Sequence, residues 1–205
     1  PTNSYPLADM VGTGQKIGII VNDITRATPS PIILQAILAE LPHLPPENIT
    51  IFVALGTHRQ NTPTELKTML GEDIVKNYSI VQNNAFDSDT QVRIGVTRSG
   101  NEVFINRHLM DCSVKVLTGF IEPHFFAGFS GGGKAIMPGM AGLDTILRNH
   151  GTENIAHPRV NWGITDGNPL YEEIWEVAEM AVGAFLLNVT LNNQQAITGV
   201  FAGDL

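Results

Sequence analysis

The sequence predicts an α/β fold: a three-layer, mainly parallel, Rossmann-like sheet with a β-hairpin insertion. Short apolar runs with little alternation, typical of strands buried on both faces, recur along the chain. Helical patterns separate these runs, and strands that alternate with helices imply a parallel sheet. The 205 residues are enough for one domain with its own core, so we expect a single α/β domain over residues 1–205.

The predicted elements follow one another as β-loop-α units. Buried strands are expected at residues 16–21, 49–55, 79–81 and 114–121. Helices are expected at residues 32–41, from Thr62 onward, in a short segment that ends at His150, and at residues 169–180. Thr28 or Ser30 can cap the first helix, and Thr62 with Glu65 forms a capping-box pattern at the second.

Two segments have the pattern of β-hairpins rather than of β-loop-α units. Residues 91–106 alternate with period two around Ser99-Gly100-Asn101, which predicts an inserted hairpin. Residues 184–191 and 195–202 flank Asn192-Asn193, so we expect the chain to close with a second hairpin.

Charge and composition argue against some classes of partner and location. The formal net charge of −8 disfavours a nucleic-acid backbone or an anionic membrane as the main partner, while it allows a local basic pocket for a small anion. The single Cys112 cannot form an internal disulfide, which suits a reducing compartment. No apolar run approaches the roughly 20 residues that span a bilayer, and the first residues lack a signal-peptide pattern. We therefore expect a cytoplasmic protein.

The most unusual stretch, residues 122–150, combines glycines with two histidines and a lysine. Glycine lets backbone approach a ligand closely at a cost of about 0.5–1 kcal/mol each, so this density indicates a site. Gly128-x-x-x-x-Gly133-Lys134 fits most of a phosphate-binding P-loop pattern. Ala135 stands where that pattern needs Ser or Thr, and Pro138 would break the helix that follows. A P-loop-like nucleotide- or phosphate-binding domain is therefore the weaker alternative.

Three polar loops leave the carboxyl ends of predicted strands, where ligands bind in parallel α/β sheets. They begin at Asp23, Gly56 and Glu122. Side chains far apart in the sequence can therefore converge, namely Arg26, His58, His124 and Lys134. Each is ambiguous alone, since loop histidines and lysines are commonly solvated or bonded to nearby backbone. Their joint placement at strand ends is what indicates a site.

These residue types suit the chemistry of a small acid. The planar guanidinium of Arg26 matches a carboxylate in a bidentate way. Two histidines on opposite sides of one carbon can remove and return a proton, as racemisation or epimerisation needs. His150 offers an imidazole to a metal, and Lys134 can hold a cofactor covalently. Because the chain has no paired cysteines and no His-x-x-x-His cluster, we do not expect a metal cage built from protein alone.

Four motifs, in order and correctly spaced, resemble the nickel-dependent lactate racemase family. They are Asp23-x-Thr25-Arg26-x-x-Pro29, Gly56-Thr57-His58-Arg59, the run from His124 to Gly132 with Lys134 and Pro138-Gly139, and His150 after the lysine. Further similar segments are Gly167-Asn168-Pro169, residues 185–189 and Ala202-Gly203-Asp204. The resemblance covers nearly the whole chain from Lys16 onward.

The resemblance implies a racemase or epimerase of a lactate-like 2-hydroxy acid. Members of the family carry a nickel-pincer nucleotide (pyridinium-3-thioamide-5-thiocarboxylic acid mononucleotide with nickel), which takes a hydride from the substrate α-carbon and returns it to either face. By similarity, this cofactor would be covalent at Lys134, and His150 would be the protein ligand of nickel. His58 and His124 would be the acid/base pair that deprotonates the substrate hydroxyl.

The resemblance also implies residues that bind substrate and cofactor. Arg26 would bind the substrate carboxylate and Asp23 would orient it. Further contacts to the phosphate or the ring of the cofactor would come from Thr57, Arg59, Gly131 and Gly132. Gly133 stands where the family has a basic residue, so we expect no charged contact from that position.

The family's enzymes are much longer than this chain and have a second domain that closes over the cofactor. We therefore expect residues 1–205 to be the N-terminal, cofactor-binding domain of a two-domain enzyme, either cut or encoded separately. The expected partners are the C-terminal domain and a small 2-hydroxy acid, with no nucleic acid and no membrane. We expect the isolated domain to be inactive. A module that kept the fold and lost the activity is a further alternative.

Overall fold

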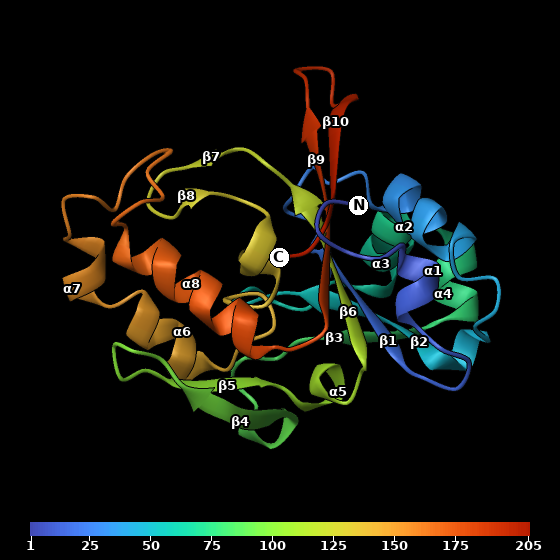
Figure 1. The fold of residues 1–205 in the computed structure, drawn as a ribbon, viewed down its shortest axis with the longest axis horizontal. Coiled ribbons are helices and arrows are strands. Elements are labelled where there is room, and N and C mark those ends of the chain that lie inside the picture. Colours follow the sequence, from blue (N-terminus) through green and yellow to red (C-terminus); the bar gives the residue numbers. More distant parts are fainter.

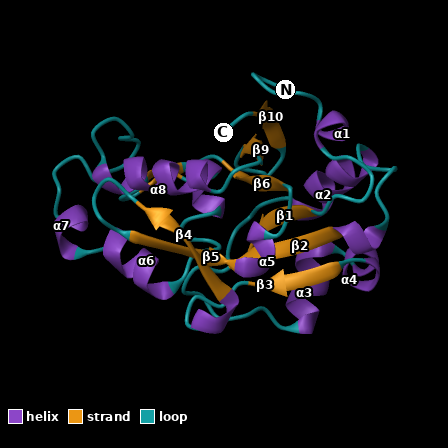
Figure 2. Cartoon of the chain, turned by 60° about the horizontal axis from the view of Figure 1, so that its bottom comes forward, coloured by secondary structure: helices purple, strands orange, loops and turns teal.

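The computed structural model describes residues 1–205 and contains one six-stranded sheet with the strand order β10-β9-β6-β1-β2-β3. The strands are β1 (Ile17–Asn22), β2 (Ile49–Ala54), β3 (Ser79–Gln82), β6 (Val114–Phe120), β9 (Ala184–Leu191) and β10 (Ile197–Gly203). All neighbours pair in parallel except β10, which is antiparallel to β9. Figure 2 shows the strands side by side in this order. The predicted mainly parallel α/β sheet is confirmed.

Helices and a small hairpin cover the two faces of the sheet and give three layers (Figure 1). One face packs against α1 (Leu7–Met10), α2 (Ser30–Ala39), α3 (Pro63–Leu70) and α4 (Glu72–Asn77). The other packs against α5 (Arg107–Met110), α6 (Leu143–Asn149), α8 (Pro169–Met180) and the hairpin of β4 (Gln91–Val96) and β5 (Glu102–Asn106). Ile19 of β1 lies in the first core and Ile20 in the second, which explains why the strand lacks polar alternation.

The two predicted helix caps have different outcomes. The capping box at α3 is confirmed, because the Glu65 N–H donates to Thr62 Oγ1 and the Thr62 N–H donates to the Glu65 carboxylate. The side-chain cap expected for α2 from Thr28 or Ser30 is wrong, since α2 begins at Ser30 without any side-chain cap. Thr28 Oγ1 instead donates to Asn22 Oδ1 at 2.7 Å and ties the loop to the end of β1.

Both predicted hairpins are present, and they have different roles. The hairpin of β4 and β5 forms a separate two-stranded sheet that covers one face of the main sheet. The hairpin of β9 and β10 joins the main sheet, because β9 also pairs in parallel with β6. Its tip projects from the body of the molecule (Figure 1). Two short 3-10 turns, η1 (Pro46–Asn48) and η2 (Ser88–Thr90), precede β2 and β4. None of the helices has the length and apolar character needed to cross a bilayer.

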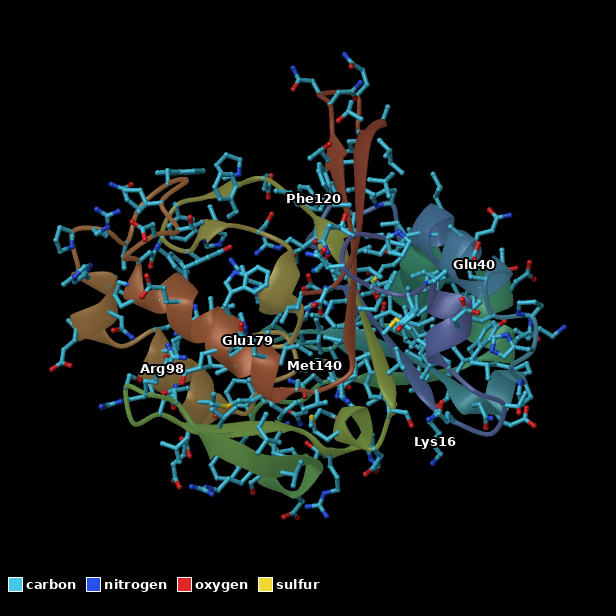
Figure 3. All side chains as sticks on the ribbon, viewed as in Figure 1. Lys16, Glu40, Arg98, Phe120, Met140 and Glu179 are labelled. Atoms are coloured by element: carbon cyan, nitrogen blue, oxygen red, sulfur yellow. The ribbon has the colours of Figure 1, made fainter.

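The segment between β6 and α6 has little regular structure, although it carries the glycine-rich stretch. It contains β7 (Pro123–His124), β8 (Gly128–Phe129) and a 3-10 turn, η3 (Gly132–Ala135), and α7 (Thr152–Ile155) follows α6. No α-helix begins at Lys134, so the helix N-terminus that a P-loop offers to phosphate is missing. Figure 3 labels Phe120 and Lys16 at opposite ends of the sheet, and the segment follows Phe120 at the carboxyl end of β6.

Candidate functional site

A cavity of about 290 Å³ opens at the carboxyl ends of β1, β2 and β6. Its walls come from the loops after β1 and β2 and from the segment between β6 and α6, which are far apart in the sequence. The predicted site residues that line it are Asp23, Arg26, Thr57, His58, His124, Gly131, Lys134 and His150. The structure therefore brings together most of the side chains that the sheet topology was expected to gather.

His58 and Asp23 form a hydrogen-bonded pair across two loops. His58 Nδ1 lies 2.7 Å from Asp23 Oδ2, and the other carboxylate oxygen of Asp23 accepts from Thr25 Oγ1 at 2.8 Å. Asp23 is 5% exposed, whereas the imidazole is about half exposed at the cavity mouth. Because the carboxylate holds the hydrogen of the neutral ring on Nδ1, the lone pair of Nε2 stays free toward a ligand. This arrangement leaves Nε2 of the neutral ring able to accept a hydrogen bond.

His124 has no carboxylate partner. Its Nδ1 accepts a hydrogen bond from the Ala127 N–H at 3.2 Å, so the hydrogen of the neutral ring lies on Nε2. The ring is buried and stacks on Phe125 with 4.7 Å between centroids. Burial lowers the pKa of His124 to about 4, and the charges of Lys134 and Arg26 act in the same direction. His124 is therefore neutral at physiological pH and offers a hydrogen-bond donor to the cavity.

Lys134 contributes an amine without an acidic partner. No hydrogen bond or ion pair joins its Nζ to another side chain, and Nζ lies over the Phe126 ring, 5.9 Å from the ring centroid. Burial lowers the pKa of Lys134 to about 7, with Arg26 adding to the effect and Glu122 opposing it. A large fraction of this amine is uncharged near neutral pH, which is the form that acts as a nucleophile.

His150 directly follows the last residue of α6 and lines the inner wall of the cavity. Burial lowers its pKa, and the charge of Lys134 lowers it further, so the imidazole is kept neutral. Its Nδ1 is buried and has no hydrogen-bond partner. A neutral imidazole with an unused nitrogen can bind a metal or a hydrogen-bonding ligand.

Phe126, which sequence reasoning did not select, lies between the three groups of the buried wall. Its ring centroid is 4.5 Å from that of His124 and 5.3 Å from that of His150, and both imidazoles meet it edge-on at 85°. Lys134 Nζ lies over the face of the same ring, 5.9 Å from its centroid. Such contacts restrict ring orientation. The only signal in the sequence is the position of Phe126 within the glycine-rich stretch.

Asn188 on β9 is a second residue that sequence reasoning did not assign to the site. It is almost fully buried, its Nδ2 donates to the Leu117 carbonyl, and its Oδ1 accepts from the Gly132 N–H at 3.1 Å. Gly131 has a φ of +79°, and a Cβ there would collide with Asn188 Oδ1. Asn188 therefore fixes the turn that leads to Lys134.

Two of the expected cofactor contacts do not line the cavity. Arg59 makes a two-pronged ion pair with Glu65, with N–O distances of 2.7 and 2.8 Å, and its side chain is mostly exposed. The hydrogen bonds from Arg59 are the main reason that the pKa of Glu65 falls to about 2. Gly132 lies behind the wall, where a Cβ would press on Trp175 of α8. The structure thus gives both residues a local packing or pairing role.

A buried carboxylate, Glu173 of α8, holds the end of α6 next to His150. It accepts hydrogen bonds from four neutral side chains, those of Thr97, Ser99, Asn101 and Asn149. Asn149 Nδ2 lies 2.7 Å from the carboxylate, and Asn149 directly precedes His150. The other three donors come from the tip of the β4–β5 hairpin, so this insertion braces α6.

The cavity is electropositive although the chain is acidic. Arg26 and Lys134 have no ion-pair partner, and only Asp23 among the predicted site residues is acidic. No group of three or more His, Cys, Asp or Glu side chains is placed to hold a metal ion. The arrangement is suited to an anionic ligand next to a base, a nucleophilic amine and a neutral imidazole.

Comparison with known proteins identifies the family. The model of the lactate racemase N-terminal domain matches residues 1–163, most of the chain. The chain belongs to this family. A lactate racemase from Thermoanaerobacterium thermosaccharolyticum is 38% identical over 204 residues, which are 99% of this chain and 48% of that protein. A lactate racemase from Lactiplantibacillus plantarum is 39% identical over 206 aligned residues, covering 100% of this chain and 49% of that protein.

Solved structures agree with this membership of the lactate racemase N-terminal domain family. The lactate racemase apoprotein from Thermoanaerobacterium thermosaccharolyticum superposes with a TM-score of 0.94 at 38% identity, covering 99% of this chain and 49% of that one. A crystal structure from Thermotoga maritima has a TM-score of 0.76 at 20% identity over 96% of this chain and 52% of that one, which shows a shared fold alone. The chain spans about half the length of the curated relatives that it matches.

Proposed function

We propose that this chain is the cofactor-carrying part of a racemase that interconverts the enantiomers of a small, lactate-like 2-hydroxy acid. The observation that carries the proposal is the unpaired amine of Lys134, which faces one cavity together with the Asp23–His58 pair, His124 and Arg26. The names of the two curated relatives support the same reaction.

The residues present fit a nickel-pincer nucleotide, the cofactor that the family resemblance implies. Lys134 would hold it covalently through its nucleophilic amine, and His150 would give nickel a protein ligand through its unpartnered imidazole. The cavity has no cage for a bare metal ion, so the other ligands would have to come from the cofactor itself. When bound, this cofactor supplies reversible hydride acceptance from the substrate α-carbon.

Arg26 and Asp23 have different roles in the proposed reaction. The Arg26 fork has no ion-pair partner and lines the cavity, so it can bind the substrate carboxylate through two parallel hydrogen bonds. Asp23 already accepts from His58 and Thr25. We therefore assign Asp23 to the orientation of His58 rather than of the substrate.

His58 and His124 would act on the substrate hydroxyl as different neutral tautomers. His58 Nε2 takes the hydroxyl proton as the α-hydrogen departs, and the Asp23 carboxylate stabilises the imidazolium that forms. His124 Nε2–H donates a hydrogen bond to the same oxygen as it becomes a carbonyl. For His124 to act as the base for the opposite enantiomer, it must give up the Ala127 contact and move its hydrogen to Nδ1.

We further propose that the active enzyme includes a C-terminal domain beyond the length spanned here, since the relatives are about twice as long. That domain would close over the cavity, which opens to solvent on the exposed side of His58 and Arg26. Residues 1–205 alone would then be inactive. A single, buried and unpaired Cys112 agrees with a cytoplasmic location.

The test uses a full-length parent expressed with the enzymes that build the cofactor. We expect intact-mass analysis to show added mass on Lys134, metal analysis to show nickel, and chiral chromatography to show racemisation of lactate. Lys134→Ala should remove the added mass and all turnover, while the melting temperature stays close to that of the parent. Added mass or turnover that survives in Lys134→Ala would contradict the assignment of the amine.

A further inference from the structure

Lys115, which is buried, and Lys134, which is half-buried, have opposite environments. Lys115 is 3% exposed, and its Nζ donates to the carbonyls of Cys112 and Val182, each at 2.8 Å. Lys134 faces the cavity, and its Nζ has no hydrogen-bond or ion-pair partner. The hydrogen bonds of Lys115 thus give it a structural role, whereas the amine of Lys134 is free to react.

The groups around Lys134 are those that imine chemistry on a lysine needs. Arg26, a second cation in the same cavity, favours the uncharged amine and can anchor a carboxylate. The Asp23–His58 pair supplies a proton acceptor on the other wall. The carbonyl carbon of a 2-oxo acid is bonded directly to its carboxyl carbon, so a carboxylate held at Arg26 brings that carbonyl into this cavity of about 290 Å³.

We infer that the cofactor-free chain captures small 2-oxo acids as an imine on Lys134, with their carboxylate held by Arg26. Nζ forms a bond to the carbonyl carbon, and the electron pair of the C=O bond moves to the oxygen, which takes a proton. The carbinolamine then loses water: the oxygen leaves with the two hydrogens that Nζ gives up, and a C=N bond remains. His58 carries protons between nitrogen and oxygen, and nothing is oxidised or reduced.

The inference rests on the proposed function for its choice of ligand, because a 2-oxo acid is the oxidised form of the proposed substrate. It adds a second use of the same nitrogen. A chain that holds a 2-oxo acid on Lys134 cannot attach a cofactor there, so the oxidised substrate would delay loading of new protein. Because the imine is reversible, its release restores the amine.

The experiment treats the cofactor-free 205-residue chain with pyruvate and then with sodium borohydride, which reduces an imine to a stable secondary amine. We expect intact mass to show one reduced pyruvyl group, and peptide mapping to place it on Lys134. The other four lysines, Lys16, Lys67, Lys76 and Lys115, are internal controls within the same sample. Labelling spread over the exposed lysines in proportion to their exposure would overturn the inference.

Two variants test the reacting amine and the carboxylate anchor separately. Lys134→Arg keeps the positive charge and should abolish the labelling, and circular dichroism should show an unchanged fold. Arg26→Gln, at an exposed loop position, should lower the ratio of pyruvate labelling to acetone labelling by about tenfold or more, because acetone has the carbonyl but no carboxylate. An unchanged ratio would overturn the role of Arg26, and labelling that persists in Lys134→Arg would overturn the site.

Failure here and failure of the racemase proposal give different results. If pyruvate labels Lys134 but a full-length parent never gains nickel or added mass, the racemase proposal fails and the imine site stands. If the parent is loaded and active but borohydride traps nothing on Lys134 of the cofactor-free chain, the imine site fails and the racemase proposal stands.

Discussion

The two sides of the cavity balance their charges in different ways. On the side of β1 and β2, His58 is paired with Asp23, and Arg59 is paired with Glu65. On the side of the segment between β6 and α6, the pKa values of His124, Lys134 and His150 are all lowered, and none of the three has a carboxylate partner. On the first side these two pairs are satisfied without a ligand, and Arg26 alone has no ion-pair partner. The second is electrostatically incomplete, and an anionic ligand would stabilise it.

The two sides also differ in how they are held. The His58 side is an exposed loop fixed by a few hydrogen bonds, so substitutions there change chemistry more than folding. The inner side is part of the core, where Glu173 joins α8, α6 and the β4–β5 hairpin through buried hydrogen bonds. Substitutions of these buried bracing residues should change folding and chemistry together, whereas Lys134 makes no such bonds and can be replaced with little effect on folding.

The largest effect on the exposed side should come from removing its base. His58→Ala in a loaded full-length parent should lower kcat by about 10²–10⁴-fold, the usual contribution of a positioned acid/base group. Because His58 is exposed, the melting temperature should change little. Steady-state racemisation with chiral detection measures the loss.

Asp23→Asn is the matched variant for the orientation of His58. It keeps the shape of the side chain and removes the negative charge, and should cost roughly ten- to a hundredfold in kcat, as when a functional histidine loses the partner that orients it. A loss larger than that of His58→Ala would mean that Asp23 contacts the reactants itself.

The next largest effect should be on folding, from removing the Glu173 carboxylate that braces the inner side. Glu173→Ala leaves the buried donors of Thr97 and Asn149 without an acceptor and should lower the free energy of unfolding by about 3 kcal/mol. Urea denaturation followed by circular dichroism measures it. Glu173→Gln is the control, because it keeps the volume and one acceptor oxygen, and should cost less. An equal loss in both variants would place the effect in the charge rather than in the hydrogen bonds.

Much of the fold could be predicted from the sequence, because burial on both faces and helix capping are local signals. The helix at residues 169–180 and the strand at 184–191 have their predicted bounds, and the Thr62–Glu65 capping box is present. The parallel sheet topology was enough to predict that the site side chains converge at the carboxyl ends of the strands. The Asp23–His58 hydrogen bond could not be predicted in this way, because its geometry depends on how two loops cross.

The residues that sequence reasoning missed act through tertiary contacts that leave no local pattern. Asn188 lies in the largely apolar strand β9, and Glu173 is one of four glutamates on α8. Only the packing shows that Asn188 fixes the glycine turn and that Glu173 fixes α6. Arg59 shows the converse, since a motif placed it at the site and a local ion pair holds it elsewhere. The glycine-rich stretch suggested a ligand loop, but Gly132 has a packing reason.

The pH dependence of folding should report the uncompensated inner side. The pKa of His124 falls from an ordinary 6.5 to about 4 on folding, so the unfolded chain binds more protons between these values. Stability should therefore fall as the pH drops from about 6.5 to 4, by on the order of 1–3 kcal/mol. Melting curves at several pH values measure this slope. His124→Asn should flatten it, and an unchanged slope would mean that His124 is charged in the folded chain.

The smallest effect should come from Arg59, which the sequence motif assigns to the cofactor and the structure pairs with Glu65. Arg59→Ala should leave cofactor loading and kcat of the full-length parent within the error of measurement, because the guanidinium does not line the cavity. Thr57→Val is the comparison variant, since Thr57 lies in the same motif and does line the cavity. Intact mass and nickel content measure loading in both. A clear loss of loading in Arg59→Ala would show that Arg59 leaves Glu65 for the cofactor, and the assignment of Arg59 to a local ion pair would no longer hold for the loaded enzyme.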